Sequence, residues 1–339
     1  MGRTWSPEQS CARPARIPRL ALRSRFLTPK IRRFHALEAS RLATLFRGSF
    51  TALVTPFRGG RLDDVALRRL VDFQLAGGTD GLVPCGTTGE APTLSSAERE
   101  EVISVVVDQV HARVGGKVPV IAGGPGNDTR SSLEIAKRAK SLGADALLAV
   151  TPYYNKPTQE GLYRHFSVLA EAGLPVIAYN VPSRTSVDLL PETVGRLHAA
   201  GAIAGLKEAT GSMPRALELV ELTRGELPLL SGDDFTVAPF LACGGHGVIS
   251  VSSNVVPRAM KTLVEAGLAG NARDACREQQ RLQALHRALF TETNPIPVKT
   301  ALAELGLIGP EIRLPLIPLS ERLLPQLRSA LAEVSEVSK

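Results

Sequence analysis

The sequence predicts an α/β protein, a closed (β/α)8 TIM barrel followed by a small C-terminal helical domain. From Phe50 onward, a short apolar run followed by an amphipathic stretch recurs at intervals of 19 to 37 residues, roughly the length of one β–α unit. Eight such runs occur. Apolar strands that alternate with helices imply a parallel sheet covered by helices. Eight units favour a closed barrel over an open doubly wound sheet, which usually has fewer strands.

The eight expected strands cover residues 50–57, 81–86, 118–123, 146–152, 175–181, 203–209, 228–232 and 247–252. Amphipathic helices are expected between them, most clearly at 96–115 and 130–144. We expect Ser96 to cap the first of these helices, which carries acidic residues in its opening turn, and Gly143 to end the second.

The strand pattern stops near residue 270. Residues 271–290 and 325–337 have helical patterns, and the proline-rich segments TNPIPVK (293–299) and RLPLIPL (313–319) join them. The predicted division is therefore a basic extension at 1–48, a catalytic barrel at 49–270 and a C-terminal helical domain at 271–339.

Composition excludes several functional classes. Hydrophobic residues make up 44% of the chain and charged residues 22%, which is ordinary for a globular protein, and no apolar run approaches the roughly 20 residues that a membrane span needs. The four cysteines lie far apart without a CxxC pair or a His at metal-ligand spacing, so we expect neither disulfides nor a metal site. A reducing compartment, the cytoplasm, follows. No strand is followed by GxGxxG or GxxxxGK[ST], which argues against dinucleotide and P-loop sites.

The net charge of +7 comes from the N-terminal extension. Residues 1–48 hold ten Arg and one Lys against two Glu, a net +9, so the remaining residues carry −2. A nearly neutral body argues against nucleic-acid binding by the barrel. The Arg- and Ser-rich, acid-poor extension overlaps in pattern with organellar transit peptides, which would place the protein in a plastid. A disordered basic arm, or a start codon assigned upstream of a true start near Phe46, would explain the same residues.

One predicted strand carries a lysine at its centre. In IAGLKEAT (203–210), alternation places Gly205, Lys207 and Ala209 on one face, and Leu206 and Glu208 on the other. Small neighbours leave space beside the lysine amine, which indicates a site. The alternative is a lysine whose stem lies on apolar surface while its ammonium reaches water.

Further polar groups fall at the ends of neighbouring strands, where barrel enzymes place their catalytic side chains. Tyr153, Tyr154 and Tyr179 fall at the ends of the fourth and fifth runs, and Arg184 comes shortly after the fifth. The loop GTTGE (86–90) offers two hydroxyls and glycine-flanked amides that can hold a carboxylate. Taken singly, these are also consistent with a tight turn, aromatic packing and a surface ion pair. Together, an amine nucleophile, hydroxyl proton carriers and two anion sites indicate Schiff-base chemistry on an oxo-acid.

The chain resembles the dihydrodipicolinate synthase family of the N-acetylneuraminate lyase superfamily, class I aldolase-like barrels. The resemblance runs from about Arg47 to Leu319. It rests on GTTGE, TPYYNKPTQEGLYRHF, YNVPSRT, GLKEATG, LLSGDD, GGHGVISV and NPIPVK, in order and at family spacing.

The resemblance implies the following catalytic residues. Lys207 would form the Schiff base with pyruvate, and Thr87, Tyr179 and Tyr154 would make a proton relay, with Tyr154 reaching into the neighbouring subunit's site. Lys299 matches a family motif and is assigned a structural role.

For substrate binding, the resemblance implies that Thr88, together with Thr87, holds the pyruvate carboxylate. Arg184 would bind the carboxylate of the second substrate, L-aspartate 4-semialdehyde. Gly232 and Ile249 would line the pocket through their main chains.

The resemblance also implies a homotetramer built from tight dimers, no cofactor beyond the covalent imine, and no nucleic-acid or membrane partner. Lysine-inhibited relatives carry imidazoles after GTTGE and a carboxylate further along, where this chain has Ser96, Arg99 and Ser131; Gly124 also replaces a more usual threonine. We expect weak or absent inhibition by L-lysine.

Two other functions are compatible with parts of the pattern. A sister aldolase that cleaves sialic acid or a 2-keto-3-deoxy sugar acid would use the same lysine, tyrosine and GTTGE loop, but its neutral polyol substrate offers nothing for Arg184 to bind. A catalytically silent barrel, or a nucleic-acid binder recruited by the basic extension, would not require the complete relay.

Overall fold

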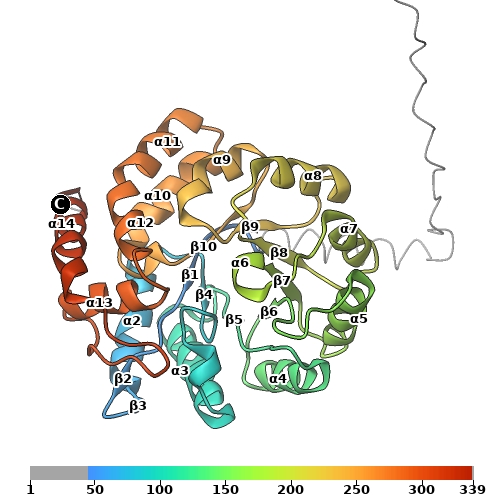
Figure 1. The fold of residues 1–339 in the computed structure, drawn as a ribbon, viewed down its shortest axis with the longest axis horizontal. Helices are drawn as coiled ribbons and strands as arrows, with labels where there is room; N and C mark the ends of the chain where they lie inside the picture. The colour runs from blue at the N-terminus through green and yellow to red at the C-terminus, as the bar shows by residue number, and fades with distance from the viewer. Residues whose placement is uncertain (1–44, 338–339) are drawn as a thin grey trace, which may run out of the picture. The chain divides into compact units, whose positions relative to one another are not determined.

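The computed structural model describes residues 45–337. The predictions for the basic extension and for Cys11 therefore fall almost entirely outside the described residues. Figure 1 shows the described chain as a ring of helices around a central set of strands.

Eight parallel strands form the barrel. In chain order they are β1 (Gly48–Ala52), β4 (Gly81–Val83), β5 (Ile121–Ala122), β6 (Ala146–Val150), β7 (Val176–Asn180), β8 (Gly205–Glu208), β9 (Leu229–Ser231) and β10 (Gly247–Ser250). Their hydrogen-bonded order is β4-β1-β10-β9-β8-β7-β6-β5. A parallel bridge between Leu82 and Val120 joins the two ends of this order, so the sheet closes. The predicted (β/α)8 fold is confirmed.

The first predicted strand is longer than the observed one. Residues 57–58 leave the barrel wall as β2 (Phe57–Arg58) and pair antiparallel with β3 (Arg61–Leu62). The turn between them is Gly59–Gly60, and both residues have positive φ, as a two-residue type I′ hairpin turn requires.

Helices cover the outside of the barrel. They are α2 (Asp64–Ala76), α3 (Ser96–Val114), α4 (Thr129–Ser141), α5 (Gln159–Ala170), α7 (Pro191–Ala199), α8 (Met213–Thr223), α9 (Val237–Ala242) and α10 (Pro257–Leu268). The four-residue helix α6 (Pro182–Thr185) lies inside this ring (Figure 1). Short 3-10 turns are η2 (Ala91–Thr93), η3 (Asp234–Thr236) and η4 (Ser252–Asn254).

The predicted cap of α3 is wrong by one residue. Ser95, not Ser96, is the N-cap: its hydroxyl accepts from the Glu98 amide, and the Glu98 carboxylate accepts from the Ser95 amide. Only Ser95 stands three residues before an acid that can return the bond, and this reciprocal capping box decides between the two serines. Gly143 has positive φ just after α4, as expected for a helix end.

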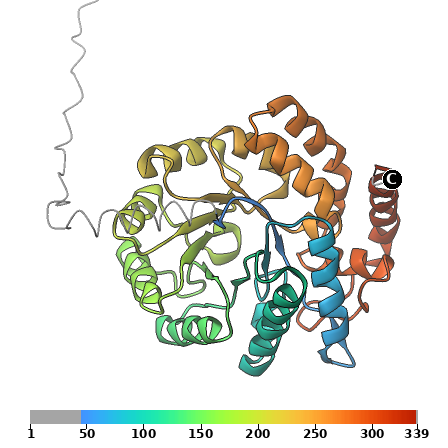
Figure 2. The same cartoon turned by 180° about the vertical axis from the view of Figure 1, so that it is seen from behind.

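The helical region after the barrel comprises α11 (Ala272–Arg281), α12 (Gln283–Leu289), α13 (Ile296–Glu304), η5 (Glu321–Leu323) and α14 (Leu324–Val337). Figures 1 and 2 show α13 and α14 outside the ring, on the side of α2. The predicted boundary of this region near residue 270 stays a prediction. No helix within residues 45–337 is long and apolar enough to cross a membrane.

The barrel has two apolar layers, separated by the strand wall. Inside it, Phe50, Ile177, Tyr179 and Ile249 belong to one buried cluster, whereas Leu206 belongs to the larger cluster between strands and helices. Because successive strand residues alternate, Tyr179 on β7 points inward and its neighbour Asn180 points outward. Tyr179 therefore lies inside the barrel, near the carboxyl end of β7.

Candidate active site

Lys207 and Tyr179 form the centre of a cavity at the carboxyl ends of the strands. They are directly paired residues of β8 and β7. The cavity, of about 220 Å³, is also lined by Thr87, Thr88 and Arg184. Residues predicted from four separate segments thus meet around one small space.

The Lys207 amine is nearly sealed from water. The residue is 6% exposed, and its Nζ lies 4.4 Å from the centroid of the Tyr179 ring. Burial lowers the pKa of Lys207 to about 8; the negative charge of Asp234 opposes this shift and the positive charge of Arg184 adds to it. A lysine with such a pKa supplies neutral amine near physiological pH, which a nucleophile for carbonyl carbon requires.

Gly232 creates the space that Lys207 occupies. A Cβ at Gly232 would lie 2.6 Å from the Ala209 Cβ and 3.0 Å from the Lys207 Cε. Any side chain there would displace the lysine stem. Of the two small residues predicted beside the lysine, Ala209 lines the same cavity and Gly205 does not. Gly232, which follows β9, adds a small residue that was not predicted as a neighbour on that strand face.

Tyr179 is placed to exchange protons. Its ring is buried, and burial raises the pKa of its phenol, while Arg184 and a hydrogen bond with the Thr87 side chain lower it. The phenol therefore stays protonated at neutral pH and is linked to a second hydroxyl. Such a pair can pass a proton between a substrate and the cavity.

Thr87 and Thr88 lie on the loop after β4. Thr88 is buried, and its hydroxyl accepts a hydrogen bond of 3.0 Å from Asn294 Nδ2. Asn294 comes from the C-terminal helical region, and its main-chain oxygen accepts a hydrogen bond of 3.3 Å from Arg184 Nη2. The helical region is therefore part of the site.

Asn294 is a site residue that the sequence reasoning missed. Its side chain lines the same cavity as Lys207, and its Oδ1 is buried without a hydrogen-bond partner among the described residues. The signal in the sequence was the polar residue at the start of NPIPVK. Nothing local connects that residue to GTTGE, which lies 206 residues away.

The other predicted residues lie at different distances from the Lys207 cavity. Arg184, on α6, lines it. Ile249 is buried inside the barrel, and Val251, two residues on, lines the cavity instead. Tyr154 is 89% exposed with φ of 72°, a left-handed conformation that is unusual for a tyrosine. Tyr153 lines a second cavity of about 250 Å³ that shares Thr87, Tyr179 and Arg184 with the first.

Lys299 contrasts with Lys207. It is also buried, but its Nζ donates to Glu90 Oε1 at 2.5 Å, and the other Glu90 oxygen accepts from the Arg313 amide. The Glu90 charge opposes the lowering of the Lys299 pKa by burial. A paired lysine is a poor nucleophile, so this one holds the GTTGE loop against α13.

Comparison with known proteins shows what the chain resembles. The profile of the dihydrodipicolinate synthetase family matches residues 45–334. A 4-hydroxy-tetrahydrodipicolinate synthase of Anaeromyxobacter dehalogenans is 58% identical over 286 residues, covering 84% of this chain and 96% of the relative.

Solved structures agree with this relationship. A chloride-inhibited dihydrodipicolinate synthase from Acinetobacter baumannii, complexed with pyruvate, has 45% identity and a TM-score of 0.83, covering 86% of this chain and 99% of its own. The enzyme of Cyanidioschyzon merolae with lysine bound has 37% identity and a TM-score of 0.82, covering 86% and 99%.

Proposed function

The chain belongs to the dihydrodipicolinate synthetase family, and we propose that it works through an imine between pyruvate and the Lys207 amine. It is a lyase of the class I aldolase type, a 4-hydroxy-tetrahydrodipicolinate synthase in activity. This enzyme condenses pyruvate with L-aspartate 4-semialdehyde, the first committed step of lysine biosynthesis through diaminopimelate. The observation that carries the proposal is a buried lysine with a pKa of about 8 facing a cavity.

The first step joins pyruvate to the enzyme. The neutral Lys207 amine attacks the C2 carbonyl of pyruvate, and the carbinolamine loses water to give the imine. Thr87 and Thr88 hold the pyruvate carboxylate through hydroxyls and loop amides. The Tyr179 phenol donates a proton to the oxygen that departs as water, and the proton that the nitrogen loses as the imine forms returns to the phenolate through Thr87.

The second step forms the carbon–carbon bond. Loss of a proton from the pyruvate methyl group gives an enamine, whose carbon attacks the aldehyde of the second substrate. The aldehyde oxygen takes up a proton and becomes a hydroxyl. The amino group of the former semialdehyde then displaces Lys207 from the imine carbon, which closes the ring and restores the free amine; one water leaves overall.

Arg184 supports a second substrate with a carboxylate. Arg184 lines the cavity, and its guanidinium is a planar, bidentate partner for carboxylates. A sugar-acid aldolase has no use for a cation there, because its polyol tail is neutral. We therefore assign the semialdehyde carboxylate to Arg184.

Tyr154 connects the proposed reaction to assembly of the protein. Its side chain is 89% exposed although it is one of the relay residues that the family resemblance implies. A left-handed tyrosine costs on the order of 1 kcal/mol, and such strain is common at functional sites. We propose that Tyr154 completes the site of a second copy, in a homotetramer made of two tight dimers. One of the structural relatives is a monomeric variant of a dihydrodipicolinate synthase, so the assembly needs its own measurement. A cytoplasmic location stays a prediction.

Borohydride trapping tests the proposal. The purified protein is reduced in the presence of pyruvate, digested and mapped by mass spectrometry. We expect one adduct, on Lys207 and not on Lys299, and no adduct in Lys207→Ala. A coupled assay with pyruvate plus aspartate semialdehyde, run beside sialic acid and keto-deoxy-gluconate, then identifies the substrate. An adduct on another lysine, or full activity of Lys207→Ala, would overturn the proposal.

A further inference from the structure

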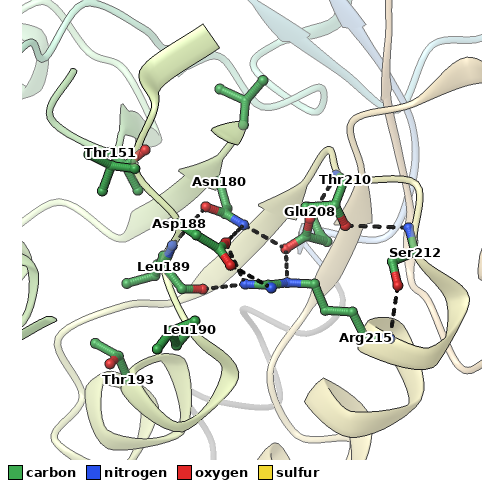
Figure 3. Close-up of polar contacts among 12 residues, drawn as sticks. Thr151, Asn180, Asp188, Leu189, Leu190, Thr193, Glu208, Thr210, Ser212 and Arg215 are labelled. Atoms are coloured by element: carbon green, nitrogen blue, oxygen red, sulfur yellow. Dashed lines mark hydrogen bonds and ion pairs between the residues drawn. The ribbon is translucent and has the colours of Figure 1, made fainter. Parts of the chain in front are cut away.

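A set of polar side chains lies behind the active site, on the outer face of the barrel wall between β7 and β8 (Figure 3). We call Asn180, Asp188, Glu208 and Arg215 the Arg215 network. Asn180 ends β7, Glu208 ends β8, and Arg215 lies on α8. Asp188 lies between α6 and α7. The network therefore connects four separate segments of the chain.

Arg215 is the centre of the network. Its Nε donates to Glu208 Oε2 at 2.9 Å, and its two terminal nitrogens donate to the two oxygens of Asp188 at 3.0 and 2.9 Å. One of these nitrogens also donates to the main-chain oxygen of Leu189. The fork of the guanidinium thus holds β8 on one side and the segment after α6 on the other (Figure 3).

Asn180 and Glu208 complete the connections. Asn180 Nδ2 donates to Asp188 Oδ1 at 2.9 Å and to Glu208 Oε2 at 3.1 Å, and its Oδ1 accepts from the Leu189 amide. The second Glu208 oxygen accepts from the Thr210 amide at 2.8 Å. Asn180 is fully buried and Glu208 is 2% exposed, so their geometry is fixed by these bonds rather than by water.

The network residues are the chain neighbours of the reacting groups. Asn180 follows Tyr179, and Glu208 follows Lys207, with the side chains on opposite faces of the wall. A shift of either network residue along its strand moves the inward-facing side chain beside it. The Asp188–Leu189 segment follows α6 by a few residues, and α6 carries Arg184.

We propose that Arg215 is a positioning residue for the imine chemistry. It acts through Glu208, Asn180 and Asp188 to hold Lys207, Tyr179 and Arg184 in register with one another. A plain stabilising role is the competing explanation, but buried charge pairs often stabilise no more than well-packed apolar residues, whereas their directional bonds specify one arrangement. The inference rests on the proposed roles of Lys207 and Tyr179.

Arg215→Met tests the inference, because it keeps the stem and removes the fork. Borohydride trapping with pyruvate counts competent sites, and kcat is expressed per trapped site. We expect this kcat to fall roughly 10- to 100-fold, as it does in metalloenzymes when a side chain that orients a metal ligand is removed. The KM for pyruvate should stay within about threefold, because Thr87 and Thr88 lie outside the network, while the KM for the semialdehyde rises with Arg184 displaced. A loss of stability alone would lower the number of trapped sites but would leave kcat per trapped site and both KM values unchanged.

Two control variants separate the hydrogen-bonding geometry of Arg215 from its positive charge and from the general effect of removing an ion pair. Arg113→Met removes a bidentate pair with Asp72 that joins α3 to α2 at 2.6 and 2.8 Å, away from any site strand. It should leave kcat per trapped site unchanged. Arg215→Lys keeps the charge without the fork, and we expect it to lose most of the same activity. Full activity in Arg215→Lys would overturn the positioning role.

A milder variant covers the case in which Arg215→Met does not fold. The Asp188 side chain is 37% exposed, so water can solvate the amide of Asp188→Asn and the protein should still fold. The substitution removes the charge that Asp188 offers to the Arg215 guanidinium. We expect the same kinetic split, smaller in size. If the folded variants show the wild-type kcat per trapped site and the wild-type KM values, the positioning role of Arg215 is wrong and the proposed function stands. Absence of the Lys207 adduct in the wild-type protein would instead overturn the proposed function, and this inference with it.

Discussion

Glu90 and Lys299, more than 200 residues apart in the chain, form an ion pair of 2.5 Å, and both side chains are almost fully buried. Glu90 belongs to the loop that carries Thr87 and Thr88, whereas Lys299 belongs to α13 of the C-terminal helical region. Asn294 of the same region contacts Thr88 directly. The pair therefore joins the helical region to the loop that forms one wall of the site.

Breaking this pair should destabilise the protein strongly. In Glu90→Gln, Lys299 keeps a buried charge without its partner, and we expect a loss of about 3–5 kcal/mol in the free energy of unfolding. Urea denaturation measures it. The double variant Glu90→Gln/Lys299→Met removes the orphaned charge and should recover part of the loss. Arg328→Gln, which breaks an exposed pair with Glu304, should cost under about 1 kcal/mol.

The pH dependence of the reaction should report the Lys207 amine. Because the pKa of Lys207 is about 8, the amine is protonated below that pH, and the rate with pyruvate should rise as pH increases through about 8. Asp234 favours the charged amine, so Asp234→Asn should lower this pKa and move the rising limb to lower pH. A limb that moves to higher pH in Asp234→Asn would contradict the assignment.

Lys207 should also limit stability. Its pKa in the folded protein is about 8 against an ordinary 10.5, a cost on the order of 3 kcal/mol while the amine is charged in both states. Between pH 8 and 10.5 the unfolded chain binds this proton and the folded chain does not, so stability rises with pH across that window. Lys207→Met should be inactive, more stable than wild type at pH 7, and without this rise; thermal unfolding at several pH values measures it.

Tyr154 should act in the site of a second copy. Tyr154→Phe removes only the hydroxyl of an exposed side chain, so we expect an unchanged melting temperature and a rate lower by roughly 10²-fold. Tyr163→Phe, on α5, is the matched control. Mixing inactive Lys207→Ala with Tyr154→Phe under conditions of subunit exchange should restore activity, because hybrid dimers contain one complete site. No recovery in verified hybrids would mean that Tyr154 does not act across an interface.

Inhibition by L-lysine should be weak or absent. The side chains at the positions where lysine-inhibited relatives carry imidazoles are Ser96 and Arg99, and Ser131 replaces a carboxylate. Arg99 brings a positive charge where a cationic amino acid would have to bind. Steady-state assays with up to millimolar lysine test this expectation; half-maximal inhibition at sub-millimolar lysine would refute it.

The eight-strand barrel could be read from the spacing of apolar runs, because each β–α unit must bury its own strand and helix face. Alternation along a single strand placed Lys207 on the same face as Gly205 and Ala209, and the structure shows that Lys207 points into the barrel cavity. The exact end of a helix was harder to predict where two adjacent residues could both serve as the cap. Ser95 rather than Ser96 caps α3 because only Ser95 completes the reciprocal bonds with Glu98.

By itself, then, the sequence determined the barrel, the rim on which the chemistry collects and the strand face that carries Lys207, since these depend on local periodicity. The tertiary structure alone decided that Asn294 enters the site, that Glu90 pairs with Lys299 and that Arg215 connects β7, β8 and the segment after α6. Each of these depends on which distant groups packing brings within about 3 Å of one another, and hydrogen bonding at that range does not follow from any pattern along the chain.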